Sequence, residues 1–262
     1  QAEANFFPGS QQKKNILTAL GRALLERLKS EPAVSFEQLG KSIYENLKSR
    51  HIQLFVHDAE TDKALATLGF TGEVVVPRCL IQNCYGVLVG LAEANVGVDK
   101  ANYFITRSLN LTSFVRTNEI ENILTVEFKN AAPAALGISG NYKNYIRLIA
   151  NDNAKVKQVG IAEAGGTKIT SPEIEKIAGR LEAGVLVDIG PGQKKAVRFT
   201  WSVPAALNFA ANGEVDYLIR KQAGTGDDVA TMKISPPAGV DFLGGTSYNT
   251  TLGKDILTKV SW

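Results

Sequence analysis

The stretch YFITRSLNLTSFVRTNEIENILTVEFK, residues 103–129, decides the fold class of this chain. β-Branched and aromatic residues dominate its two halves, 103–116 and 120–129, and apolar residues alternate there with polar ones. Successive side chains of a strand point to opposite faces of a sheet, so this alternation is typical of strands with one buried face. The stretch therefore predicts two half-buried β-strands.

Similar runs follow one another along most of the chain after Gly72. We predict further strands at residues 73–76, 87–92, 145–149, 155–161, 185–189, 196–203, 215–221, 229–234 and 256–260. Turn-forming residues lie between several of them, as in the sequence GPG at 190–192. Many strands with short turns and no helical pattern between them predict a large antiparallel β-sandwich, immunoglobulin-like or jelly-roll-like.

The first part of the chain has helical periodicity instead. Apolar residues recur every three or four positions over residues 11–29, which predicts a helix with one apolar face. Ser35 and Gln38 have the spacing of a capping box, which predicts the start of a second helix. Residues 52–56 predict a short strand, and residues 59–68 predict a short helix.

These patterns together predict an α+β chain. A short helical segment occupies residues 1–71, and a β-rich region occupies residues 72–262. Two glycines and a proline interrupt the strands near residues 165–172, so the β-rich region has a second candidate division there.

The charge pattern bears on the class of partner. The formal net charge is +3, and the lysines and arginines are scattered among acids. A surface that binds nucleic acid carries clustered basic residues, so we expect no nucleic-acid partner. The one methionine is Met232, and the chain opens without the charged-then-apolar pattern of a signal peptide. We therefore expect an upstream part that carries any membrane anchor.

The two cysteines, Cys79 and Cys84, lie close together in the sequence. They could close a small disulfide loop, which would indicate an oxidising compartment, or they could be two free thiols. Their spacing leaves both interpretations open. A structural zinc site needs four ligands, and His51 and His57 do not form a second closely spaced pair, so we expect no metal.

The segment EANVGVDKANY, residues 93–103, is the most distinctive candidate for a binding site. It is polar and joins two apolar strands, so its side chains could converge on a sugar or on a partner surface. The candidate residues are Glu93, Asn95, Asp99, Lys100, Asn102 and Tyr103. The alternative is a strand connection whose Asn and Asp side chains satisfy their own backbone.

Motifs of self-contained enzymes are missing from the sequence. The stretch GTGDD at 224–228 lacks the Lys-Ser/Thr of a phosphate-binding loop and the spaced acids of a calcium loop, so we predict a hairpin turn. Neither Gly-x-Ser-x-Gly nor His-Glu-x-x-His occurs. We therefore predict no catalytic residues and no cofactor in this chain.

Several stretches of the sequence together resemble a bacterial family. They are residues 11–20, 35–39, 51–55, 93–104, 142–147 and 220–225. They are similar to the C-terminal half of the domain-of-unknown-function family numbered 4012. The resemblance covers nearly the whole chain, and residues 95–104 are its most specific part. It implies an extracytoplasmic protein of the bacterial cell envelope, membrane-anchored through its upstream part.

The upstream half of that family resembles the LytR-CpsA-Psr domain, which transfers glycan polymers from a polyisoprenyl pyrophosphate carrier to the cell wall. The helix at residues 11–20 is similar to the one that closes this domain, where an arginine precedes paired glutamines. Pro8, Gly9 and Ser10 stand at those positions here. Because arginine grips pyrophosphate by paired hydrogen bonds, this departure argues against phosphotransferase activity of the chain by itself.

The resemblance implies a disulfide between Cys79 and Cys84, and it puts a functional surface at residues 93–103 on equal terms with a plain strand connection. The function that we expect is a non-catalytic module that binds wall glycan or an envelope protein. Two alternatives stay open: an accessory part of a LytR-CpsA-Psr-like glycopolymer phosphotransferase, and a structural spacer.

Overall fold

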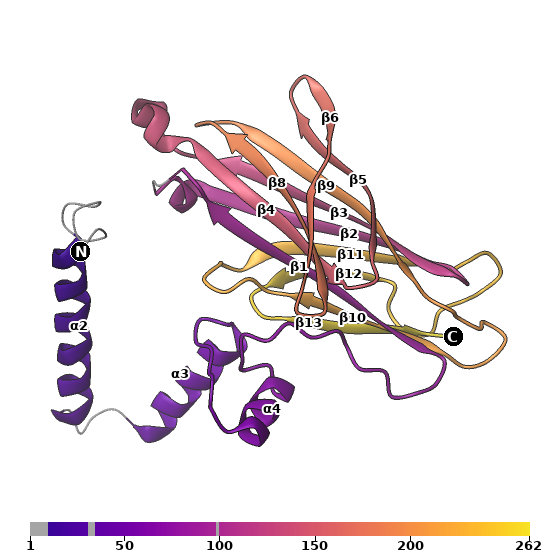
Figure 1. Ribbon diagram of the computed structural model, residues 1–262, viewed down its shortest axis with the longest axis horizontal. Helices are drawn as coiled ribbons and strands as arrows, with labels where there is room; N and C mark the ends of the chain where they lie inside the picture. The colour runs from indigo at the N-terminus through magenta and orange to yellow at the C-terminus, as the bar shows by residue number, and fades with distance from the viewer. Residues whose placement is uncertain (1–9, 31–34, 98–99) are drawn as a thin grey trace. The chain divides into compact units, whose positions relative to one another are not determined.

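A computed structural model of the chain describes residues 10–30, 35–97 and 100–262 (Figure 1). The chain divides into two compact units, Gln1–Asn46 and Leu47–Trp262. Strands make up 48% of the structure and helices 20%, so the protein is mostly β. None of the described helices combines the length and the apolar character needed to cross a bilayer.

Two of the predicted helices begin in the first unit. Helix α2 spans Ser10–Ser30, and α3 spans Phe36–Lys48 and ends in the second unit. The backbone amide of Gln38 donates to the Ser35 hydroxyl at 3.4 Å, so Ser35 caps α3 as predicted.

The third helix, α4 (Ala59–Thr67), is capped by Asp58, whose carboxylate accepts from the Thr61 amide at 2.9 Å. The strand predicted at 52–56 is wrong, because there only Leu54 forms an isolated bridge, with Thr71. Phe55 is 76% exposed, so this short apolar run has no sheet face on which to bury its side chains.

The second unit is built around two stacked sheets, which form a β-sandwich (Figure 1). The first sheet has the order β13-β10-β1-β4-β8-β7, with β1 Cys84–Asn95, β4 Tyr142–Asn151, β7 Glu173–Ile177, β8 Arg180–Ile189, β10 Glu214–Arg220 and β13 Ile256–Ser261. The second has the order β12-β11-β2-β3-β9-β5-β6, with β2 Ile105–Val115, β3 Glu119–Asn130, β5 Lys155–Glu163, β6 Gly166–Thr170, β9 Lys194–Pro204, β11 Asp228–Ser235 and β12 Ser247–Leu252. Two 3-10 helices, η1 (Ala101–Phe104) and η2 (Ala134–Gly140), follow β1 and β3.

The sheets are mixed rather than purely antiparallel, which corrects the sequence-based prediction. Strand β10 pairs with β1, and β11 pairs with β2, in parallel. The other strand pairs of the described residues are antiparallel. Alternating hydrophobicity reports which side chains face the core, and it carries no information about the direction of a partner that is distant in the sequence.

Three further sequence-based predictions concern residues 73–76, 224–228 and 165–172. The strand predicted at 73–76 is wrong, because these residues are irregular and pack Val74 and Val76 against a patch on the outer face of the first sheet. The turn predicted at 224–228 is not a hairpin, since it connects β10 of the first sheet to β11 of the second. The division near 165–172 falls where β5 pairs with β6.

The hydrophobic core lies between the two sheets and takes residues from both. Its largest fully buried side chains include Phe128, Phe199, Trp201 and Tyr217. Full burial of one such side chain stabilises a fold by roughly 1.5–3 kcal/mol.

Candidate functional site

A pocket of about 480 Å³ opens at one end of the second sheet, over neighbouring strands β2, β3, β9 and β5. Ligand sites of proteins commonly measure about 300–1,000 Å³. The residues that line it are Thr106, Arg107, Ser108, Glu127, Phe128, Lys129, Ala162, Glu163, Lys194, Lys195 and Ala196.

The row nearest the end of the sheet consists of Thr106, Lys129 and Lys194, because Lys129 is the cross-strand partner of the other two. The adjacent Phe128 is 1% exposed and points into the core, so strand alternation turns Lys129 to the solvent face. All three residues of the row are exposed. The row therefore presents one hydroxyl and two ammonium groups to solvent.

The next row on the same face consists of Ser108, Glu127, Ala196 and Ala162. Three of these side chains are small, which leaves a hollow above the sheet. Glu127 is exposed and adds a carboxylate. The pocket thus combines hydrogen-bond donors and acceptors around a floor of small residues.

The inward-facing cations of the lining are already paired. Lys195 Nζ lies 2.8 Å from a carboxylate oxygen of Glu163, its neighbour across β9 and β5. Arg107 Nε donates to a carboxylate oxygen of Asp228 at 2.7 Å, and Nη2 forms an ion pair with the same oxygen at 2.6 Å. Arg107 also pairs with Glu93. The Arg107 guanidinium therefore binds carboxylates of the fold and is not available to a ligand.

Arg107 forms the centre of a buried ion network behind the pocket. Its side chain is 8% exposed, and that of Glu93 is 6% exposed. Burial alone lowers the pKa of the Arg107 guanidinium, but the charges of Glu93 and Asp228 outweigh burial and raise this pKa. The group is therefore a permanent cation that holds two carboxylates inside the sandwich.

Glu93, a predicted binding residue, is fully occupied inside this network. One carboxylate oxygen pairs with Arg107, and the other accepts from Tyr142 Oη at 3.1 Å and from Asn144 Nδ2 at 3.0 Å. Burial, followed by the charge of Glu93, raises the pKa of the Tyr142 phenol, which keeps it a donor. The Gln222 amide closes the network by bonding both backbone groups of Glu93, at 2.9 and 3.0 Å.

The structure shows different surroundings for the other predicted residues of the 93–103 segment that it describes. Asn95 Oδ1 accepts from the Gly97 amide at 3.0 Å, which is an Asx turn of the kind that satisfies its own backbone. Lys100 and Asn102 are exposed around η1, and Tyr103 is 84% exposed with its ring edge against Phe104. Asp99 lies outside the described residues.

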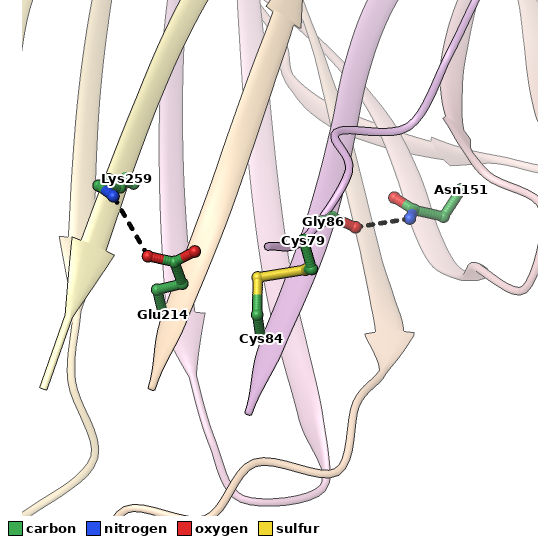
Figure 2. The surroundings of a disulfide bond; sticks show 6 residues. All are labelled: Cys79, Cys84, Gly86, Asn151, Glu214 and Lys259. Carbon is green, nitrogen blue, oxygen red and sulfur yellow. Dashed lines mark hydrogen bonds and ion pairs between the residues drawn. A yellow bond between two sulfur atoms is a disulfide. The ribbon is translucent and has the colours of Figure 1, made fainter. Parts of the chain in front are cut away.

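Cys79 and Cys84 form a disulfide, with their Cα atoms 5.6 Å apart (Figure 2). It fixes the end of residues 71–78, which we call the strap, to the start of β1. The Asn151 side chain braces the same strand by donating to the Gly86 carbonyl at 2.8 Å (Figure 2).

The strap covers part of the outer face of the first sheet. Its Val74 and Val76 pack against an apolar patch that includes Leu88, Ile149 and Leu218. Its backbone passes so close to β1 that a Cβ on Gly86 would overlap the Pro77 carbonyl. This close approach explains the glycine, because the other residues carry a Cβ.

Two buried arginines hold the other end of the strap. Arg220 donates to the carbonyls of Glu73 and Gly72, the latter at 2.7 Å. Arg50 donates to the Thr71 carbonyl at 3.1 Å and forms a two-pronged ion pair with Asp255. Burial, aided by the nearby charge of Arg50, lowers the pKa of Arg220 to about 10.

Beside the disulfide, Cys84 lies with Glu214 and Asp216, close enough to share a metal ion. The sulfur is taken up by the disulfide, and Glu214 pairs with Lys259 at 3.2 Å (Figure 2). Metals bind the thiolate form of cysteine, so this cluster does not fit a metal while the disulfide is intact.

Sequence reasoning did not identify the lysines of the pocket. Lys129 and Lys194 end one predicted strand and precede another, and each by itself has the pattern of an ordinary solvent-facing residue. Only the pairing of β3 with β9 brings them together. Both lysines lie at an end of a strand with alternating hydrophobicity, and this was the available signal. It becomes informative only when the pairing of the two strands is known.

No family model matches the sequence, and no curated protein does. Solved structures show distant likenesses. One is a candidate nutrient binding protein from Legionella pneumophila, at 10% identity and a TM-score of 0.41, over 68% of this chain and 67% of the other. The leukotriene A4 hydrolase of Saccharomyces cerevisiae follows at 10% identity and a TM-score of 0.31, over 62% of this chain and 30% of the enzyme. An M1 zinc metallopeptidase from Deinococcus radiodurans has 11% identity and a TM-score of 0.30, over 60% and 38%.

These likenesses are too weak to carry an argument about function. This chain spans well under half the length of both peptidase-like proteins, 30% and 38%. What the chain does must therefore be argued from its own residues.

Proposed function

We propose that this chain is a non-catalytic, extracytoplasmic module of a bacterial cell envelope and that it binds wall glycan in the pocket of the second sheet. The observation that carries the proposal is the pocket itself. It surrounds a floor of small side chains with exposed hydroxyl, ammonium and carboxylate groups, from Thr106, Lys129, Lys194 and Glu127. Such a mixture suits a ligand that is rich in hydroxyl groups.

The disulfide supports the proposed compartment. Disulfides persist in oxidising environments and are rare in the cytosol. Cys79 is exposed, so a reducing cytosol would have access to this bond. An extracytoplasmic location is consistent with its formation.

The buried ion network supports a binding role. Arg107 and Glu93 form a buried ion pair behind the pocket, and each also binds further partners inside the fold. The groups left at the mouth can orient a ligand by hydrogen bonds. A finer proposal concerns the fold: stacked sheets with mostly antiparallel neighbours support an immunoglobulin-like or jelly-roll-like sandwich.

The test is retention of the purified chain on isolated bacterial cell walls, before and after protease treatment of the walls. Ala196→Trp on β9 fills the pocket floor. Thr112→Trp is the matched control, because Thr112 lies on the outer face of the same sheet, in β2, away from the lining. We expect walls of both kinds to retain the wild type and the control but not Ala196→Trp.

Retention that is lost after protease treatment would instead indicate an envelope protein as partner. Equal retention of the two tryptophan variants would remove the pocket from the proposal. Circular dichroism of each variant shows whether it is folded, so that a loss of binding is not confused with unfolding.

A further inference from the structure

We propose that the pocket recognises an acidic sugar, with Lys129 and Lys194 binding its anionic group and Glu127 accepting from its hydroxyls. This inference rests on the proposed function and names the ligand class. It follows from a division among the charged side chains of the pocket lining, since some form ion pairs within the fold and others have no acidic partner among the described residues.

The two lysines are directly opposite each other on antiparallel strands β3 and β9. Like charges in that position repel and destabilise the strand pair. In the part of the chain that the structure describes, neither ammonium group has an acidic partner within ion-pair distance. An anion held between them would relieve the repulsion, so the pair is matched to a negatively charged group.

The remaining lining charges cannot serve the same purpose. Lys195 is paired with Glu163, and Arg107 is held by Glu93 and Asp228. If a ligand bound either cation, the carboxylate that now pairs with it would lose its partner, and for Arg107 that carboxylate would be buried. The positive potential available to a ligand therefore comes from Lys129 and Lys194.

Glu127 argues for a sugar with isolated acidic groups rather than for a dense polyanion. It lies on the same face, two residues before Lys129, and it is exposed. The Glu127 carboxylate would repel a polymer that carries closely spaced negative charges, whereas it can accept hydrogen bonds from sugar hydroxyls. Thr106 and Ser108 add hydroxyls from the neighbouring strand β2, opposite Lys129 and Glu127, and Ala196 on β9 leaves room for a ring.

The experiment is calorimetric titration of the full chain with three oligosaccharide probes of equal length. The probes are an oligogalacturonate, which carries carboxylates, a phosphodiester-linked oligosaccharide, and a neutral oligogalactoside. The variants are Lys129→Gln with Lys194→Gln, and Lys233→Gln as the matched control. Lys233 is exposed on the outer face of the same sheet but lies outside the pocket.

We expect at least one acidic probe to bind more than tenfold more tightly than the neutral one. The double variant should lose that preference, and Lys233→Gln should keep it. The stronger of the two acidic probes identifies the acidic group, since carboxylate and phosphodiester are presented separately. Binding of the acidic probe should also weaken as salt concentration rises.

Two results would overturn the inference and leave the proposed function standing. One is equal binding of acidic and neutral probes, and the other is an acidic preference that survives in the double variant. Failure of every probe, while walls still retain the chain through the pocket, would also reject the acidic sugar. Failure of both walls and probes would reject the inference together with the proposed function.

Discussion

The outer faces of the two sheets use positive charge in opposite ways. At the first sheet, Arg220 of β10 and Arg50, from the turn after α3, are 8% and 5% exposed and donate to carbonyls of the strap. On the second sheet, Lys129 and Lys194 are exposed and, within the described residues, have no acidic partner. A buried cation requires partners because it has lost its water, whereas an exposed cation keeps its water until a ligand replaces it. The strap thus covers part of the first face, whereas the second face is open to another molecule.

The largest expected effect is the difference in unfolding free energy between removing a paired cation and removing one that has no acidic partner among the described residues. Arg107→Met should lower the free energy of unfolding by about 3–5 kcal/mol, because it leaves the buried carboxylates of Glu93 and Asp228 without their cation. Lys129→Met should change it by less than about 0.5 kcal/mol. Urea denaturation of both variants measures the difference. Similar losses in the two variants would break the contrast between used and available charges.

The next effect tests how tightly the strap closes the first sheet. Gly86→Ala should cost stability toward the upper end of about 1–3 kcal/mol, because the added Cβ meets a backbone carbonyl of the strap, which cannot swing aside as a side chain does. Gly226→Ala is the matched control, since nothing lies within 4 Å of its Cβ position. Thermal unfolding compares them. A harmless Gly86→Ala would mean that the strap is held loosely.

Removing the disulfide tests the same closure from the other end of the strap. Cys79→Ser with Cys84→Ser should lower the free energy of unfolding by about 2 kcal/mol, the entropy expected for so short a loop. Amide hydrogen exchange should quicken within the strap and stay unchanged at Lys129 and Lys194. Faster exchange at the pocket as well would show that the two faces are coupled.

The smallest effect concerns Asp216, an acid on the outer face of the first sheet. Partial burial, followed by the charge of Glu214, raises its pKa above the ordinary value, so folding takes up protons in that pH range. Its favourable contribution is complete below the pKa of the unfolded chain and is lost as pH rises through the raised pKa. Asp216→Asn should therefore stabilise the fold at pH 7 by a few tenths of a kcal/mol and have no such benefit near pH 3. Chemical denaturation at the two pH values measures this difference. A variant that is less stable at pH 7 would contradict the assigned sign.

Strand positions could be predicted where alternation was strong. Strands β2 and β3 lie within a residue or two of the predicted 103–116 and 120–129, because their alternation matches one buried and one solvated face. Strands β6, β7 and β12 were missed. The side chains of β6 and β7 are almost all exposed, so their sequences carry no alternating pattern to detect.

The segment at 73–76 shows the opposite failure. Its apolar residues do pack, as a strand's would, but they pack on the outer face of a sheet rather than beside another strand. Hydrophobicity reports burial and cannot distinguish the two modes. For the candidate site, the sequence drew attention to Glu93, whose neighbours in space, Arg107, Tyr142 and Asn144, come from other strands.

The sequence by itself determined that this chain is mostly β after its first helices, and which side chains of β2 and β3 face the core, because these properties depend on the local period of apolar residues. Only the tertiary structure decided that β10 and β11 pair in parallel and that Glu93 is neutralised by Arg107. It alone placed Lys129 opposite Lys194. Each of these depends on contacts between residues far apart in the chain, and such contacts are chosen by the packing of the whole sandwich.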